Sequence, residues 1–220
     1  MAEATLKDQN VSTIRLFVGG VVLAFAALHL GADVVGETLT PSSIAASVDP
    51  YRLAVSAVGG VFSLLLLNLL PPSAKAALVF WRVRDVLPGA RAFTVIGPRD
   101  ERVDLGALAT TYGDLPTSPA QQNRQWYRIY REREGEPGVR DAHRSYLLYR
   151  ELASVSVLLL VLLIVASAAV IGAPFQLTLL FGVLLGGVYV LAAVNARHSG
   201  ERLVANVLAS ASVGHGLANS

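Results

Sequence analysis

The chain has 220 residues, of which 53% are hydrophobic and only 15% charged, whereas an average soluble domain carries about 25% charged residues. It contains no cysteine, which excludes disulfides, thiolate metal sites and a cysteine nucleophile. Its net charge of +2 is too small to indicate a nucleic-acid partner. This composition argues against an ordinary soluble enzyme and favours a membrane protein whose first partner is the lipid bilayer.

Four apolar runs are each long enough to cross a bilayer, which takes about 20 residues of helix. They lie at about 14–33, 53–71, 152–172 and 175–195. Each run must satisfy its own backbone amides within lipid, so all four are expected to be helices. The predicted fold is therefore all-α: an integral membrane four-helix bundle with a helical cytoplasmic domain inserted between spans two and three.

Lys and Arg are distributed unevenly between the spans. Residues 72–151 hold thirteen of the eighteen, whereas the loops at 36–51 and 173–176 hold none. Positively charged segments stay in the cytoplasm, so we expect a bacterial inner-membrane protein with both termini and 72–151 cytoplasmic. The chain then divides into a first membrane pair, a cytoplasmic domain, a second membrane pair and a cytoplasmic tail, over 1–71, 72–151, 152–196 and 197–220.

The predicted cytoplasmic domain begins after Pro71-Pro72, which ends the second span. A helix is predicted over 73–86, stopped by Pro88-Gly89. This helix either lies on the lipid headgroups, with Trp81 near the membrane surface, or packs against the rest of the domain. Residues 91–96 are read as a short strand or an extended linker.

Two further helices are predicted from their capping residues. Asp104 is expected to cap a short helix that ends at Gly113. Ser118 is expected to cap a second helix, with Pro119 at its first position, that runs to about residue 134. A last helix is predicted to run from Val139 without interruption into the third span.

Arg and aromatic residues are concentrated on the helix predicted after Ser118. Helical spacing places Arg124, Arg128 and Arg131 on one face and Trp126 and Tyr130 on the neighbouring one. Arg offers paired donors to phosphate or carboxylate, and an aromatic ring adds stacking. These five residues are therefore predicted to bind a partner protein or an anionic ligand. The alternative is a solvated Arg face balanced by the glutamates at 132, 134 and 136. A second run of similar composition lies at 143–150.

Two groups within the spans have a possible functional reading. His29, Asp33 and Glu37 recur at helical spacing at the outer end of the first span, where they form either an ion or proton site or an interfacial polar cluster. Gly182 and Gly186 have the small-xxx-small spacing of helix contacts. That contact lies either within one bundle or between the copies of a homo-oligomer.

Sequence motifs for catalysis, metal binding and cofactor binding are missing. The four histidines show no paired metal spacing, and the chain has no phosphate-binding loop, dinucleotide fingerprint or nucleophile elbow. We therefore expect no cofactor, no metal and no enzymatic activity.

In topology the chain resembles bacterial four-span membrane proteins that are paired with a cytoplasmic sensor in anti-phage or stress systems. This resemblance implies a membrane-anchored effector or partner subunit whose cytoplasmic domain binds a protein or nucleotide signal. Two other functions stay open: a small ion- or proton-conducting protein that uses the polar group of the first span, and a lipid-modifying membrane enzyme. A fold-level likeness does not by itself decide between them.

Overall fold

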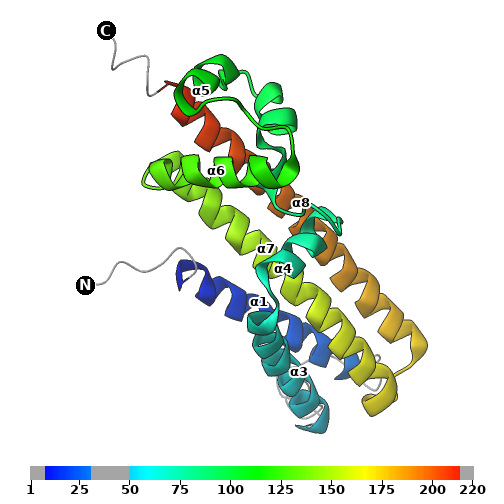
Figure 1. Cartoon of the computed structure of the whole chain (residues 1–220). Helices are drawn as coiled ribbons and strands as arrows, with labels where there is room; N and C mark the ends of the chain where they lie inside the picture. The colour runs from blue at the N-terminus through cyan, green and yellow to red at the C-terminus, as the bar shows by residue number, and fades with distance from the viewer. Residues whose placement is uncertain (1–7, 31–49, 214–220) are drawn as a thin grey trace. The chain divides into compact units, whose positions relative to one another are not determined.

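The computed structural model describes residues 8–30 and 50–213, and all regular structure in these ranges is helical (Figure 1). Four long helices are present: α1 (Asp8–Leu30), α3 (Pro50–Leu69), α7 (Pro137–Val165) and α8 (Phe175–Val213). Shorter elements connect them: α4 (Pro72–Phe80), η1 (Pro88–Arg91), η2 (Ala92–Ile96), η3 (Gly97–Arg99), α5 (Leu105–Tyr112), α6 (Pro119–Arg133) and η4 (Ala166–Ile171).

Four helices are long and apolar enough to cross a membrane, and each overlaps one of the four predicted spans. Their bounds are Gln9–Ala27, Pro50–Leu69, Pro137–Ile171 and Phe175–Val213. The all-helical class and the four candidate spans are thus confirmed, and these are the helices that a multi-pass membrane protein requires.

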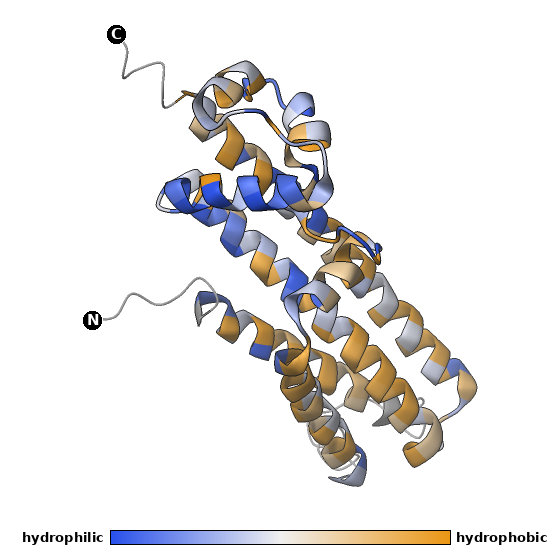
Figure 2. Cartoon of the chain, in the orientation of Figure 1, coloured by the Kyte–Doolittle hydropathy of each residue, from blue (hydrophilic) through white to orange (hydrophobic). Residues whose placement is uncertain are grey.

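The chain divides into two compact units. The span unit consists of 11–71 and 151–192, and the head unit consists of 1–10, 72–150 and 193–220. Figure 2 shows hydrophobic residues along the helices of the span unit and hydrophilic residues along α6 of the head unit. Helices α7 and α8 each contribute to both units, because each continues beyond its apolar stretch.

Within the span unit, the helices touch through small and aromatic residues. A Cβ atom built on Gly60 of α3 would lie 2.7 Å from Val22 Cγ2 of α1, so this approach needs a glycine. Phe25 of α1 and Phe181 of α8 meet edge to face, with ring centroids 4.9 Å apart. Aromatic pairs favour this geometry. Both contacts hold α1 against its neighbours.

Three serine hydroxyls in the span unit bond within their own helices. Ser56 and Ser63 donate to the carbonyls of Arg52 and Gly60 on their own helix. Ser156 donates to Leu152 in the same way. Such bonds satisfy the hydroxyl within its own helix, which is how a polar side chain is tolerated in an apolar environment.

The head unit has its own hydrophobic core. The core draws on η2, α5, α6, α7 and the last part of α8, and its members include Phe93, Leu108, Ile129, Val139, Tyr146, Val204 and Leu208. Helix α8 therefore continues past the expected end of the fourth span at 195 and reaches Val213. Its last five turns carry an apolar stripe that α6 and α7 cover, which stabilises a helix where propensity alone does not.

The helix predicted over 73–86 is shorter than expected. Helix α4 ends at Phe80, and Trp81 adopts a positive φ of 50°. Arg197 of α8 donates from Nε to the Val79 carbonyl at 2.5 Å, and its guanidinium lies 3.6 Å above the Trp81 ring. Arg197 thus satisfies a carbonyl at the end of α4, where no intrahelical donor is available. Val83, within the range predicted as helix, is 97% exposed.

The prediction of a strand or an extended linker over 91–96 was wrong. Residues 92–96 form a turn of π-helix between two short 3₁₀ turns. Gln122, 1% exposed, explains this conformation. Its Oε1 accepts from the backbone N–H groups of Phe93 and Thr94 at 3.0 and 3.3 Å, and its Nε2 donates to the Thr117 carbonyl at 2.8 Å.

The two helices predicted from their caps are confirmed. The Asp104 side chain accepts from the Ala107 N–H at 2.9 Å at the start of α5, and Gly113, with φ of 81°, ends it. Ser118 precedes α6, with Pro119 at the first position, but its hydroxyl donates to the Gln121 side chain and accepts no backbone N–H of the first turn. The helix from 139 is also present and begins at Pro137.

Candidate functional site

Helix α6 has one face buried in the head core and an opposite face that is exposed. Gln122, Trp126 and Ile129 are buried in the head core. Arg124 and Arg128 are exposed, four residues apart on the opposite side. This division follows the helical period, which sets residues of one face three or four positions apart. The five predicted site residues therefore separate into distinct environments.

The first environment is an open groove of about 630 Å³ beside Arg124 and Arg128. The turn before α6 forms its other wall, and the lining residues are Asp114, Leu115, Pro116, Gln121, Arg124, Gln125 and Arg128. Neither arginine has an ion pair or a hydrogen bond among the described residues. With one carboxylate against two guanidinium groups, the groove carries a net positive charge.

Arg131 lies outside this groove. Its guanidinium is 3.1 Å from the Glu134 carboxylate, and Arg133 is 3.4 Å from Glu136 in the same i, i+3 arrangement. The predicted alternative of arginines balanced by glutamates thus applies to the last turn of α6 and not to Arg124 and Arg128. The helix separates into one turn with neutralised charge and two turns whose cations are available for an anion.

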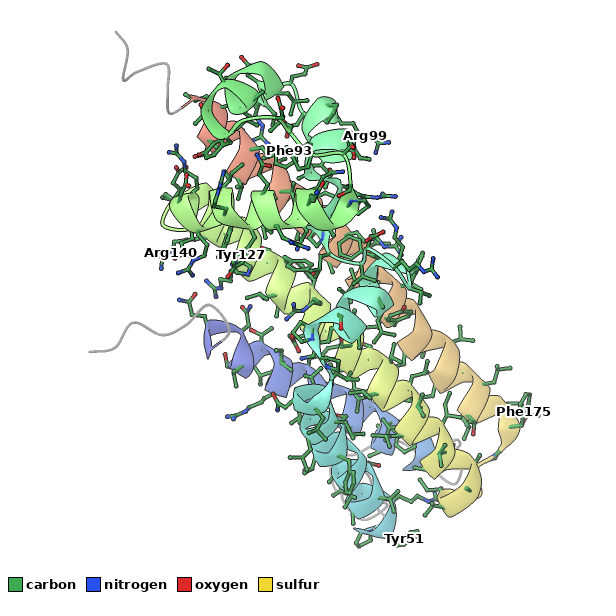
Figure 3. The ribbon with its side chains drawn as sticks, viewed as in Figure 1. Tyr51, Phe93, Arg99, Tyr127, Arg140 and Phe175 are labelled. Atoms are coloured by element: carbon green, nitrogen blue, oxygen red, sulfur yellow. The ribbon has the colours of Figure 1, made fainter. Side chains whose placement is uncertain are left out.

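The second environment is an aromatic cavity of about 230 Å³ that contains Trp126 and Tyr130. Their rings stack with centroids 5.6 Å apart, and Tyr127, which projects from α6 in Figure 3, lies 5.8 Å from Tyr130. Trp126 is 7% exposed, and its Nε1 has no acceptor in the part of the chain that the structure describes. A Cβ on Gly89 would come within 2.5 Å of the Trp126 ring, so only glycine leaves it this position.

Residues from α7 complete the aromatic cavity. His143 Nδ1 lies 2.8 Å from the Tyr130 hydroxyl, and the Arg150 guanidinium lies 5.5 Å from the centre of the Tyr146 ring. Burial, and next the Glu134 carboxylate, raise the pKa of Tyr130 above its ordinary value. The hydroxyl is therefore protonated at neutral pH. The cavity offers rings, one imidazole and one guanidinium, which suits a flat apolar group and no cation.

Two Arg-aromatic runs of the sequence meet in this cavity. Trp126 and Tyr130 come from the run that was predicted to bind, and His143, Tyr146 and Arg150 come from the second run. The two runs were not predicted to lie together in space, although their shared composition was a signal for it. No sequence signal marked Asp114 and the rest of the turn before α6 as part of the groove, because their position depends on how the chain folds back onto α6.

The other predicted sites are partly described. His29 falls in α1, but its side chain, like Asp33 and Glu37, lies outside the described residues. A Cβ on Gly182 would lie 3.3 Å from Ile164 Cδ1 of α7, whereas a Cβ on Gly186 would meet nothing within 4 Å. Gly182 thus faces a helix of the same chain, and Gly186 faces open space.

Within the described ranges, no group of three or more His, Asp or Glu side chains is placed so that it could hold a metal ion. No family model, curated protein or solved structure matches the chain. The four candidate spans, the groove with Arg124 and Arg128, and the aromatic cavity are therefore the features on which a function can rest.

Proposed function

We propose that this protein is a non-enzymatic, membrane-anchored partner subunit or effector whose head unit binds an anionic cytoplasmic partner. The observation that carries the proposal is the pair of exposed, unpaired guanidinium groups of Arg124 and Arg128 in one groove. Exposed arginines on a helix are usually balanced by a nearby carboxylate, as Arg131 is by Glu134. An unbalanced pair with planar, bidentate donors suits a carboxylate or phosphate group.

The partner we favour is a protein with an acidic surface. The groove is open and shallow, lined by leucine and proline as well as by the arginines. Such a mixture of apolar and Arg residues is typical of protein interfaces. A nucleotide signal is the second candidate for the same donors. Pairing with a sensor in anti-phage or stress defence belongs to this proposal through topology alone.

The proposed location is a bacterial inner membrane, with both termini and the head unit in the cytoplasm. Thirteen of the eighteen Lys and Arg lie in 72–151, and such segments are retained on the cytoplasmic side. Reporter fusions at Gly113 and Ser43 test this orientation. A cytoplasmic signal at Gly113 and a periplasmic one at Ser43 are expected, and the reverse pattern contradicts the topology.

We further propose that the four spans form a bundle and that copies of it associate through Gly186. This glycine is open, and small residues allow two helices to approach closely in lipid. Ion conduction through His29, Asp33 and Glu37 is the alternative function. The hydroxyls of Ser56, Ser63 and Ser156 bond within their own helices. This favours a structural role for these three serines.

Photocrosslinking in cells tests the binding proposal. A photoreactive amino acid at Gln121, which lines the groove, should form an adduct with the partner. The double variant Arg124→Ala/Arg128→Ala should lose that adduct, because charge-assisted hydrogen bonds are worth about 1.5–3 kcal/mol each.

The matched control removes the same charge from the same helix. Arg131→Ala/Arg133→Ala takes away two arginines that already have carboxylate partners, so its adduct should persist. If both double variants crosslink as the wild type does, the groove is not the binding surface. If both lose the adduct equally, the attraction depends on total charge and not on this site.

A further inference from the structure

Residues 81–87 form an exposed loop with an unusual composition, which we call the Arg-Trp loop. It follows α4 and reads Trp-Arg-Val-Arg-Asp-Val-Leu. Val83 is 97% exposed, Trp81 54% and Leu87 39%. Large apolar side chains and arginines thus alternate along this segment. Soluble surfaces tolerate single apolar residues, but a cluster of them marks an interaction site.

The attachment of the loop to α8 fixes its level relative to the bilayer. The apolar part of α8 runs from Phe175 to about residue 194, about 30 Å at 1.5 Å per residue and therefore the thickness of the hydrocarbon core. Arg197 follows within one turn. Its guanidinium lies 3.6 Å above the Trp81 ring, and its Nε donates to Val79. Trp81 is therefore held where α8 leaves the hydrocarbon.

The charges around the loop are predominantly positive. Arg82 and Arg84 have no ion pair among the described residues. The pKa of Arg91 is lowered by burial and next by the charge of Arg82, with Arg99 acting in the same direction and Glu201 opposing them. A cation whose pKa is lowered by neighbouring positive charges is stabilised by an external anion. Asp85 is the one carboxylate within the loop.

We propose that the Arg-Trp loop binds the anionic phospholipid headgroups of the membrane that the four helices cross. Trp81 and Val83 enter the interfacial layer, where Trp is enriched, and Arg82 and Arg84 bind lipid phosphates. The proposal rests on the membrane placement of the four spans but not on the groove of α6. It gives the head unit a second attachment to the bilayer besides its connections to the spans.

A bilayer fits the loop better than a protein partner does. Leu87 at the end of the loop lines the aromatic cavity. Trp81 and Val83 line none of the cavities found among the described residues, so they lack the concave surface that a protein partner's side chains usually fill. The interface of a bilayer accepts apolar and cationic groups together without shape complementarity. The position beside Arg197 supplies the contact with that interface.

The absence of cysteine from the chain allows a direct test with the full-length protein. A spin label on Val83→Cys reports its surroundings through collisions with oxygen, which dissolves in lipid, and with a water-soluble nickel chelate. Val83 is 97% exposed, so the substitution leaves the fold intact. Gly135→Cys is the matched control, because a Cβ there meets nothing within 4 Å and the residue lies between α6 and α7.

Vesicles of phosphatidylcholine with phosphatidylglycerol should make the Val83 label accessible to oxygen and shielded from the nickel chelate. The Gly135 label should show the opposite. Adding Arg82→Gln and Arg84→Gln to Val83→Cys should shift the label toward water, by about fivefold in the population ratio for each arginine near an anionic surface. Vesicles of phosphatidylcholine alone should reproduce that shift.

Each other outcome overturns the proposal. A Val83 label that collides with nickel as often as the Gly135 label places the loop in water. Shielding from both probes indicates a protein contact, either with a second copy or with a partner. Lipid contact that is independent of phosphatidylglycerol and of Arg82 and Arg84 excludes headgroup recognition. Failure of the protein to float with the vesicles contradicts the membrane spans instead, so the two hypotheses fail separately.

Discussion

Gln122 is the residue at which a single substitution tests the packing of the head unit most directly. Its side chain lies between α6 and η2 and bonds to Phe93, Thr94 and Thr117. The variant Gln122→Leu keeps the volume of the side chain but removes its acceptor and donor. The Phe93 N–H then loses its acceptor in a buried position, and the more exposed Thr94 N–H loses its own as well.

The magnitude follows from these partners. A buried polar group without a hydrogen bond costs about 1–3 kcal/mol. The Phe93 amide is buried, whereas Thr94 and the Thr117 carbonyl reach solvent in part and cost less. The sum is about 3 kcal/mol of local stability, because leucine leaves no cavity. A loss of this size accelerates amide exchange through local opening by about a hundredfold.

Hydrogen exchange measured by mass spectrometry is the assay, with peptides that cover 92–96 as the readout. Gln121→Leu is the control: Gln121 is exposed and bonds to the Ser118 hydroxyl at 2.8 Å, so its loss should change stability by less than about 0.5 kcal/mol. Equal exchange in the two variants would show that the side chain of Gln122 does not determine the conformation of η2. Phe93, labelled in Figure 3, is the amide to follow.

Substitutions at four other positions give separate tests. Trp81→Ala should be less stable to heat than Trp81→Gly by about 1 kcal/mol, because alanine retains the cost of a positive φ and glycine does not. Arg197→Gln should speed amide exchange at the end of α4, since it removes the ring contact and the bond to Val79, together about 1–3 kcal/mol. Gly60→Leu should lower thermal stability by about 1–3 kcal/mol through overpacking against α1. Gly186→Leu should leave stability unchanged but reduce crosslinked dimers, and unchanged dimers would exclude Gly186 from the contact.

Features with a local cause could be predicted from the sequence. The caps of α5 depend on Asp104 and Gly113, which lie within the same ten residues as the helix they end. The spans depend on runs of apolar residues, and no distant contact is needed to recognise them. For the same reason the Arg-aromatic composition of α6 was visible in advance.

Features with a distant cause could not be predicted in this way. Helix α4 ends where Arg197 meets it, and this residue follows Val79 by 118 positions. The π-helical turn at 92–96 depends on Gln122, 28 and 29 positions away from its partners. Periodicity and propensity contain no record of such contacts, so the helix was extended too far and the turn was read as extended chain.

The distribution of the head core along the chain has a consequence for biosynthesis. Phe93 and Ile129 precede the third span, whereas Val204 and Leu208 follow the fourth. A ribosome therefore releases the first part of this core before the last part exists, and two candidate membrane spans are synthesised in the interval, which takes on the order of seconds. Until α8 is complete, the nascent chain carries an open apolar surface. A stop codon at residue 197 should accordingly give a product that chaperones retain or proteases remove, although all four predicted spans would be present.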